Sequence, residues 1–190
     1  MVEIILGSQS PRRKQLLELA DLKCEVLVAA IDETPPSVIE AVDVPEYLAW
    51  EKAKAIQEKF SDLVKGKAIV TSDTIVYCEG MILGKPKDRL DAVHMLESLS
   101  GRIHEVITGV AIIYEGQEVI FKESVNVHFN ELTADEIAYY VDTYQPYDKA
   151  GAYAIQEWIG AIGISKIEGD YYSVMGLPIQ RVRKELLKLV

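Results

Sequence analysis

Two neighbouring arginines end the segment Ser8-Gln9-Ser10-Pro11-Arg12-Arg13, at the expected start of a helix. Ser10 is a typical N-cap residue, and Pro11 is a typical first helical residue. Because a helix N-terminus favours anions, Arg12 and Arg13 break a local rule there without a local gain. Two interpretations stay open. The segment is either a phosphate site, where N–H groups, serine hydroxyls and guanidinium groups converge on a polyanion, or a solvated basic surface turn.

Lys52 shares a stripe of a second expected helix with apolar residues, at helical spacing from Leu48, Ala49, Ala55 and Ile56. An ammonium group on such a face needs an anionic partner, unless its stem passes the core and reaches water. Both interpretations of Lys52 stay open at this point.

Asp73 interrupts an apolar strand within Thr71-Ser72-Asp73-Thr74. Strands disfavour Asp, and a carboxylate in a buried strand must be paired, metal-bound or catalytic. Two weaker signals are Asp32-Glu33 and Gly84-Lys85-Pro86, each of which is by itself typical of a solvated loop.

Together these segments hold the residues needed for metal-assisted attack on a phosphoryl group. The cations are Arg12, Arg13, Lys52 and Lys85, and the carboxylates are Glu33 and Asp73. The sequence has no Walker loop, dinucleotide fingerprint, candidate Cys–His pair or nucleophile-elbow serine. We therefore expect direct attack by an activated water.

Hydrophobic period and turn residues predict the elements that position these side chains. Strands are expected over 2–6, 67–78 and 81–83, and 103–114 and 119–129 are expected to form a long antiparallel hairpin. Helices are expected over 11–20, 43–60 and 88–99, after Thr133, and from Pro178 onward, with capping boxes at Asp43 and Thr133. Residues 145–177 lack clean periodicity. The pattern predicts an α/β fold with a mixed sheet, as a single domain over 1–190.

The composition is that of an ordinary globular protein, with 190 residues, 49% hydrophobic and 26% charged. A net charge of −10 argues against nucleic acid or an anionic membrane as a partner. The apolar stretch 2–6 is too short for a signal sequence and no later run reaches membrane-spanning length, so a cytoplasmic protein is expected.

Cysteine and histidine usage gives no metal or disulfide signal. Cys24 and Cys78 are expected to be buried thiols in a reducing compartment. The histidines His94, His104 and His128 lack ligand-like spacing and are expected to be ordinary surface or sheet residues.

A set of motifs in fixed order resembles the Maf family over essentially the whole chain. The motifs are Ser8-Gln9-Ser10-Pro11-Arg12-Arg13, Asp32-Glu33, Ser72-Asp73-Thr74, Gly84-Lys85-Pro86, the segment 149–156 (KAGAYAIQ) and the segment 169–178 (GDYYSVMGLP). The resemblance implies a nucleoside triphosphate pyrophosphatase that cuts between the α and β phosphates and uses a divalent metal, Mg²⁺ or Mn²⁺. It also implies an elongated mixed α/β fold with two lobes around a central cleft, commonly as a homodimer.

The resemblance also implies roles for individual residues. The family's proton acceptor falls on Asp73, and its specificity positions fall on Arg12, Thr74 and Gln156. The polar groups around phosphates and metal match Ser8, Arg13, Lys52 and Lys85 for phosphate and Glu33 for metal.

The ending Ala-Ile-Gln of segment 149–156 resembles the branch that acts on dTTP and UTP, with modified pyrimidine nucleotides as further substrates. A Gln156 amide offers one acceptor and one donor, which match the N–H and C=O of a uracil or thymine edge. Two departures from the family pattern are Ser72, where Ala is more common, and Glu157-Trp158, where many relatives have small residues. The alternatives are another base preference, such as 7-methyl-GTP or broad pyrimidine use, and a regulatory inhibitor of septum formation.

Overall fold

Seven strands form one mixed sheet within residues 2–189, the part of the chain that the computed structural model describes. They are β1 (Ile4–Leu6), β2 (Cys24–Val26), β3 (Ala68–Cys78), β4 (Met81–Leu83), β5 (Ile103–Tyr114), β6 (Gln117–Phe129) and β7 (Ile164–Glu168). The sheet order is β2-β1-β3-β5-β6-β7, and β4 pairs with β3 off this path. β1 is parallel to β2 and β3, whereas β4 is antiparallel to β3 and β7 to β6.

Helices join these strands, which confirms the predicted mixed α/β class. They are α1 (Pro11–Leu19), α2 (Val44–Lys59), α3 (Arg89–Leu99), α4 (Ala134–Tyr144), α5 (Trp158–Gly163), α6 (Tyr171–Val174) and α7 (Ile179–Lys188), with short 3-10 turns η1 (Ala41–Asp43) and η2 (Ala150–Ala152). In the described range 2–189, no helix combines the length and apolar character that crossing a bilayer requires.

The chain divides into two units. Unit 1 comprises Met1–Asp73, Thr108–Glu123 and Gly176–Val190, and unit 2 comprises Thr74–Ile107 and Ser124–Met175. The divisions fall inside β3, β5 and β6, so each of these strands contributes residues to both units. The single domain predicted over residues 1–190 stays a prediction.

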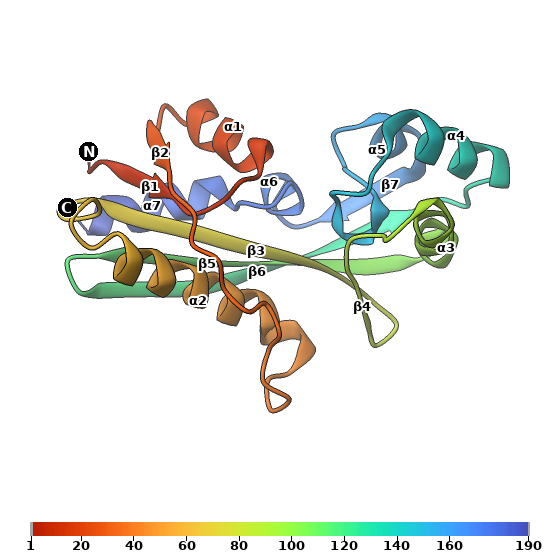
Figure 1. Ribbon diagram of the computed structural model, residues 1–190. Helices are drawn as coiled ribbons and strands as arrows, with labels where there is room; N and C mark the ends of the chain where they lie inside the picture. Colours follow the sequence, from red (N-terminus) through yellow and green to blue (C-terminus); the bar gives the residue numbers. More distant parts are fainter. Residues whose placement is uncertain (1, 190) are drawn as a thin grey trace. The chain divides into compact units, whose positions relative to one another are not determined.

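In unit 1, helix α2 packs against the strands through small residues. Ala49 and Ala53 are fully buried, and with Ile56 they join a core cluster that includes Ile5 of β1 and Ile69 of β3. Figure 1 shows α2 along one side of the strands of this unit and α1 along the other. Because alanine is small, the backbone of α2 can lie close to the sheet. The first carbons of the Lys52 side chain are therefore near the core.

The start of α2 differs from the prediction. The expected capping box at Asp43 is wrong, because the Asp43 side chain caps no backbone N–H and pairs instead with the ammonium of Lys122 on β6. A full positive charge competes effectively with a backbone N–H for a carboxylate. The first turn is fixed by contact instead: a Cβ on Gly109 of β5 would lie 2.2 Å from the carbonyl carbon of Pro45, so only glycine allows this approach.

In unit 2, both α3 and α4 have N-terminal caps, and only the one at Thr133 was predicted. Asp88 accepts a hydrogen bond from the backbone N–H of Asp91, and the capping box between Thr133 and Glu136 is present in both directions. The apolar faces of both helices bury Leu96, Leu99 and other residues in one core cluster with β5 and β6. The two-residue connection between β5 and β6 confirms the predicted hairpin.

The segment 145–177, for which no elements were expected, contains η2, α5, β7 and α6. Helix α5 is hard to predict because two of its six residues are Gly160 and Gly163, and glycine is a poor helix former. Gly160 is required by contact, since a Cβ there would lie 1.8 Å from the carbonyl oxygen of Ile155. Strand β7 has only five residues, too few for a clear alternating signal.

The cysteine predictions are half right. Cys78 is buried, whereas Cys24 is half-buried because β2 forms the edge of the sheet. Burial raises the pKa of both thiols above the usual value.

His104 is a buried residue in the core of unit 2, with an exposed fraction of 2%. Its Nε2 lies 2.8 Å from the hydroxyl of Tyr153, and its ring meets those of Phe129 and Tyr153 edge-on. Desolvation, with a smaller contribution from His128, lowers the pKa of His104 to about 4. The imidazole therefore stays neutral in the folded protein at pH values where the unfolded chain is already protonated.

This burial predicts a pH-dependent stability. The unfolded chain binds the proton more readily, so the contribution is complete above pH 6.5 and is lost as the pH falls toward 4, by about 3 kcal/mol. We expect His104→Gln to remove this part of the pH dependence in urea denaturation at pH 7.5 and 4.5. His94→Gln, at an exposed position of α3, is the control and retains it. Equal pH dependence in wild type and His104→Gln would contradict the assignment.

Candidate functional site

The ammonium of Lys52 joins two carboxylates in unit 1. Its Nζ lies 2.7 Å from Oδ1 of Asp73 on β3 and 2.8 Å from Oε1 of Glu33. The side chains of Lys52 and Asp73 are each 17% exposed, whereas that of Glu33 is 64% exposed. Of the two interpretations of Lys52, the structure favours the anionic partner, and it also pairs the strand carboxylate of Asp73.

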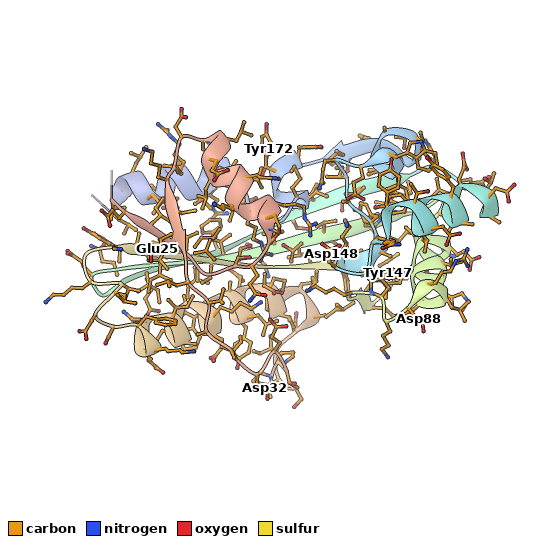
Figure 2. All side chains as sticks on the ribbon, turned by 45° about the horizontal axis from the view of Figure 1, so that its top comes forward. Glu25, Asp32, Asp88, Tyr147, Asp148 and Tyr172 are labelled. Carbon is orange, nitrogen blue, oxygen red and sulfur yellow. The ribbon has the colours of Figure 1, made fainter. Side chains whose placement is uncertain are left out.

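Glu33 lies in the loop between β2 and η1. Its neighbour Asp32, labelled in Figure 2, accepts a hydrogen bond of 2.9 Å from the backbone N–H of Thr34. Hydrogen bonds from the side chain of Thr34 and from its backbone N–H lower the pKa of Asp32 below its usual value. The local turn keeps the chain from continuing as a strand and leaves the Glu33 carboxylate within reach of α2.

Arg13 links three segments of unit 1. Its Nε donates to the carbonyl of Gly176 at 2.8 Å, and its Nη1 donates to Oγ of Ser8 at 3.1 Å and to the carbonyl of Ser72 at 2.7 Å. Desolvation lowers the pKa of Arg13, while the nearby carboxylate of Asp73 opposes this shift. The guanidinium thus fixes the backbone directly before Asp73.

The start of α1 is built differently from the prediction. Ser10 occupies the N-cap position, but its side chain caps no N–H group. Instead the buried Ser8 accepts from the backbone N–H of Ser10 at 3.2 Å. Arg12 is half-buried next to Arg13 and contributes to lowering its pKa. Ser8 and both arginines therefore gather at this helix start.

Ser72 has a structural contact that the sequence reasoning missed. Its buried hydroxyl donates to the carbonyl of Gly176 at 2.8 Å, the same oxygen that accepts from Arg13. Both contacts join residues 104 or more positions apart in sequence, so neither periodicity nor a short motif could reveal them.

In unit 2, three segments that carry candidate residues are tied together. The backbone N–H of Gly151 donates to the carbonyl of Gly84 at 3.0 Å, next to the exposed Lys85. A Cβ on Gly151 would lie 2.9 Å from a side-chain carbon of Val76, two residues after Thr74. The turn before Lys85, the end of β3 and the segment that leads to Gln156 therefore lie in contact.

Gln156 lines a pocket of unit 2 with a volume of about 470 Å³. The lining residues are Ile155, Gln156, Glu157, Gly160, Ala161, Ile164, Ser165, Lys166, Ile167 and Tyr171. A pocket of this volume is in the range of small-molecule sites. Tyr172, beside the pocket residue Tyr171, is labelled in Figure 2.

One of the lining residues, Glu157, belongs to a hydrogen-bonded group that the sequence did not predict. The hydroxyl of Tyr140 donates to Oε2 of Glu157 at 2.5 Å and accepts from the backbone N–H of Ala154 at 3.2 Å.

Within residues 2–189, no group of three or more His, Cys, Asp or Glu side chains lies together as a metal site.

Comparison with known proteins gives one family and several full-length relatives. The family model described as "Maf-like protein" matches residues 3–189. The dTTP/UTP pyrophosphatase of Bacteroides thetaiotaomicron is 46% identical over 190 residues, covering 98% of this chain and 96% of that protein. The dTTP/UTP pyrophosphatase of Phocaeicola vulgatus is 47% identical over 188 residues, with the same two coverages. That of Christiangramia forsetii is 44% identical over 188 residues, covering 99% and 94%.

One similar solved structure is a nucleoside-triphosphatase, a dITP/XTP pyrophosphatase, from Mycobacterium abscessus. It aligns with a TM-score of 0.38 and 16% identity, over 67% of this chain and 72% of that chain. This similarity is too low to assign any residue of the present chain a role.

Proposed function

Because this chain belongs to the Maf family, we infer that it is a nucleoside triphosphate pyrophosphatase that acts on dTTP and UTP. The relatives named dTTP/UTP pyrophosphatase match it nearly from end to end. The observation that carries the proposal is the contact of Lys52 with both Asp73 and Glu33. The products are the nucleoside monophosphate and pyrophosphate.

Asp73 is the proton acceptor for the attacking water in this proposal. The ammonium of Lys52 lies 2.7 Å from its carboxylate. A triphosphate carries more negative charge than one carboxylate and competes for Lys52. Asp73 then takes a proton from the water while the water oxygen forms a bond to the α-phosphorus. The bond between the α-phosphorus and the bridging oxygen breaks, and pyrophosphate leaves.

The carboxylate of Glu33 also suits a divalent cation, Mg²⁺ or Mn²⁺. Mg²⁺ in nucleotide sites is commonly held by one or two carboxylates together with substrate phosphates. The Glu33 carboxylate already faces one cationic centre, the Lys52 ammonium, at 2.8 Å. A bound cation would supply charge neutralisation at the phosphoryl oxygens.

Ser8, Arg12, Arg13 and Lys85 complete the phosphate-facing groups of the proposal. The gathering of Ser8 and the two arginines at the start of α1 supports this role, because hydroxyl, guanidinium and backbone N–H groups all donate to phosphate oxygens. Lys85 is exposed in its turn, so its ammonium is accessible to an anion.

The phosphate role of Arg13 predicts a loss that does not depend on the base. We expect Arg13→Ala to lower kcat/KM by roughly tenfold to hundredfold for UTP, dTTP and CTP alike, since a hydrogen bond to a charged group contributes about 1.5–3 kcal/mol. Because Arg13 also anchors Gly176, thermal unfolding is measured beside the kinetics. A loss confined to one base, in a folded variant, would contradict the phosphate role.

Gln156 reads the base, with Thr74 and Arg12 as further specificity residues. Its side chain is exposed and lines the pocket of unit 2. An amide carries a donor and an acceptor side by side, which is complementary to the imide edge of uracil and thymine.

The experiment that tests the proposed function measures pyrophosphate release from a panel of nucleoside triphosphates, with Mg²⁺ or Mn²⁺. The panel contains dTTP, UTP, CTP, a purine triphosphate and 7-methyl-GTP. We expect dTTP and UTP to have the highest kcat/KM. Preference for 7-methyl-GTP or another purine would reject the base assignment, and absence of pyrophosphate from every member would reject the enzyme itself.

The homodimer, the cytoplasmic location and the absence of nucleic-acid and membrane partners stay predictions. Light scattering during size-exclusion chromatography measures the oligomeric state directly. A second role as an inhibitor of septum formation has no specific observation in its favour.

A further inference from the structure

The segment that ends at Gln156 is buried up to that residue. Gly151–Ile155 are buried, and Gln156 itself is exposed. None of the described residues forms a hydrogen bond with the side-chain amide of Gln156. The backbone next to Gln156, in contrast, is held by a hydrogen bond from the N–H of Ala154 to the hydroxyl of Tyr140. A buried, ordered segment thus presents one amide at the surface, where a ligand can reach it.

The hydroxyl of Tyr140 holds this segment on both sides of Gln156. It accepts from the backbone N–H of Ala154, two residues before, and donates to the carboxylate of Glu157, one residue after. The Tyr140 ring is fully buried in the core cluster of unit 2. A single phenol, fixed by α4, therefore sets the course of the chain through residues 154–157.

Two further contacts restrain the same segment. The side chain of Lys149 is 8% exposed, and its Nζ lies 3.4 Å from Oε1 of Glu157 and 2.7 Å from Oδ1 of Asp148. Asp148 is labelled in Figure 2, in the segment after α4. Gly160 packs on the carbonyl of Ile155, with no room for a Cβ. The Glu157 carboxylate thus has a separate partner on each oxygen.

We propose that Tyr140 and Glu157 are positioning residues that orient Gln156 for discrimination between pyrimidine bases. The proposal rests on the proposed function, in which Gln156 reads the base. Fixing the backbone before substrate binds removes the entropy cost of ordering it during binding. It also holds the amide in one place, so a base with the wrong donor and acceptor pattern meets no adjustable partner.

The hydroxyl of Tyr140 stays protonated over the pH range of the assays, so its hydrogen bond to Glu157 persists. Burial and the neighbouring Glu157 carboxylate raise the pKa of Tyr140 well above its usual value. The phenol therefore keeps its proton at any pH where the enzyme is assayed, and it donates to Glu157 throughout.

The test compares kcat/KM for UTP and CTP in Tyr140→Phe. We expect the ratio of UTP to CTP to fall about tenfold, chiefly through a higher KM for UTP, while pyrophosphate remains the product. The matched control is Tyr144→Phe on the same helix, whose hydroxyl forms no hydrogen bond with the described residues and whose ring stacks on that of Tyr140. It should leave the ratio unchanged.

Two substitutions at residue 157 distinguish a positioning role of Glu157 from a general loss of order in the segment. Glu157→Ala removes the acceptor for the Tyr140 hydroxyl and should lower the ratio about tenfold. Glu157→Gln keeps an acceptor oxygen and should restore most of the ratio. Glu97→Gln, at an exposed position of α3, controls for the loss of one negative charge in unit 2.

A double-mutant cycle with Gln156→Ala gives the deciding result. If Tyr140 acts through Gln156, Tyr140→Phe has no further effect on the ratio once Gln156 is absent. The inference is overturned if Gln156→Ala narrows the ratio but Tyr140→Phe and Glu157→Ala, both folded, leave it unchanged. If Gln156→Ala itself leaves the ratio unchanged, the proposed base reading fails, and with it the role of Tyr140.

Discussion

We expect Asp73→Asn to lower kcat for UTP by roughly 10²–10⁴-fold while the protein stays folded, because the variant loses its general base. The amide is close in size to the carboxylate and keeps an oxygen that accepts from Lys52, so β3 and its packing are preserved. What it loses is the capacity to take a proton from water. The measurement is steady-state pyrophosphate release, with thermal unfolding of the same preparation.

The control for Asp73→Asn is Asp62→Asn, at an exposed position in the turn after α2. It makes the same chemical change in unit 1, away from Lys52, and should leave kcat unchanged. Near-normal turnover of a folded Asp73→Asn variant would reject Asp73 as the proton acceptor. Glu33 would then be the next carboxylate to examine, because it shares the Lys52 ammonium.

We expect Gln156→Ala to lower the ratio of kcat/KM for UTP to that for CTP by roughly tenfold to hundredfold, mostly by reducing activity on UTP. Uracil presents an N–H between two carbonyls, whereas cytosine presents an amino group and an unprotonated ring nitrogen, so one amide orientation cannot serve both equally. A mismatch leaves a buried polar group unpaired, at a cost of about 1–3 kcal/mol. Truncation to alanine removes this discrimination while the phosphate chemistry continues.

The comparison for Gln156→Ala is Gln180→Ala, an exposed glutamine of α7 in unit 1. Its base ranking should equal that of the wild type. An unchanged ranking in Gln156→Ala would place base selection elsewhere, and the residues around Trp158 would be the next to test. Trp158 packs edge-on against Tyr139, with ring centroids 4.9 Å apart, and borders the same segment.

Local patterns predicted the elements that carry the candidate site residues of unit 1. The apolar run of β3 and the helical stripe of α2 were both correct, and the need of Lys52 for an anion is met by Asp73. These predictions succeeded because the signals lie within one element or within a few residues of it.

Contacts between distant segments could not be predicted in this way. The pairing of Asp43 with Lys122 displaces an expected cap, and it joins residues 79 positions apart. The contact between Tyr140 and Glu157 depends on how α4 packs against the segment after it. Composition and periodicity carry no information on contacts between distant segments, so they predict no elements for residues 145–177.

The tight contact between Gly160 and the Ile155 carbonyl has a consequence for protein engineering. A library designed to change base preference can vary residues 156–158, because Gln156 is exposed and Glu157 and Trp158 are only half-buried. Position 160 should be excluded from randomisation, since any Cβ there would displace the backbone that supports residue 156. Fewer of the residues that line this pocket can therefore be substituted than the number of lining residues suggests.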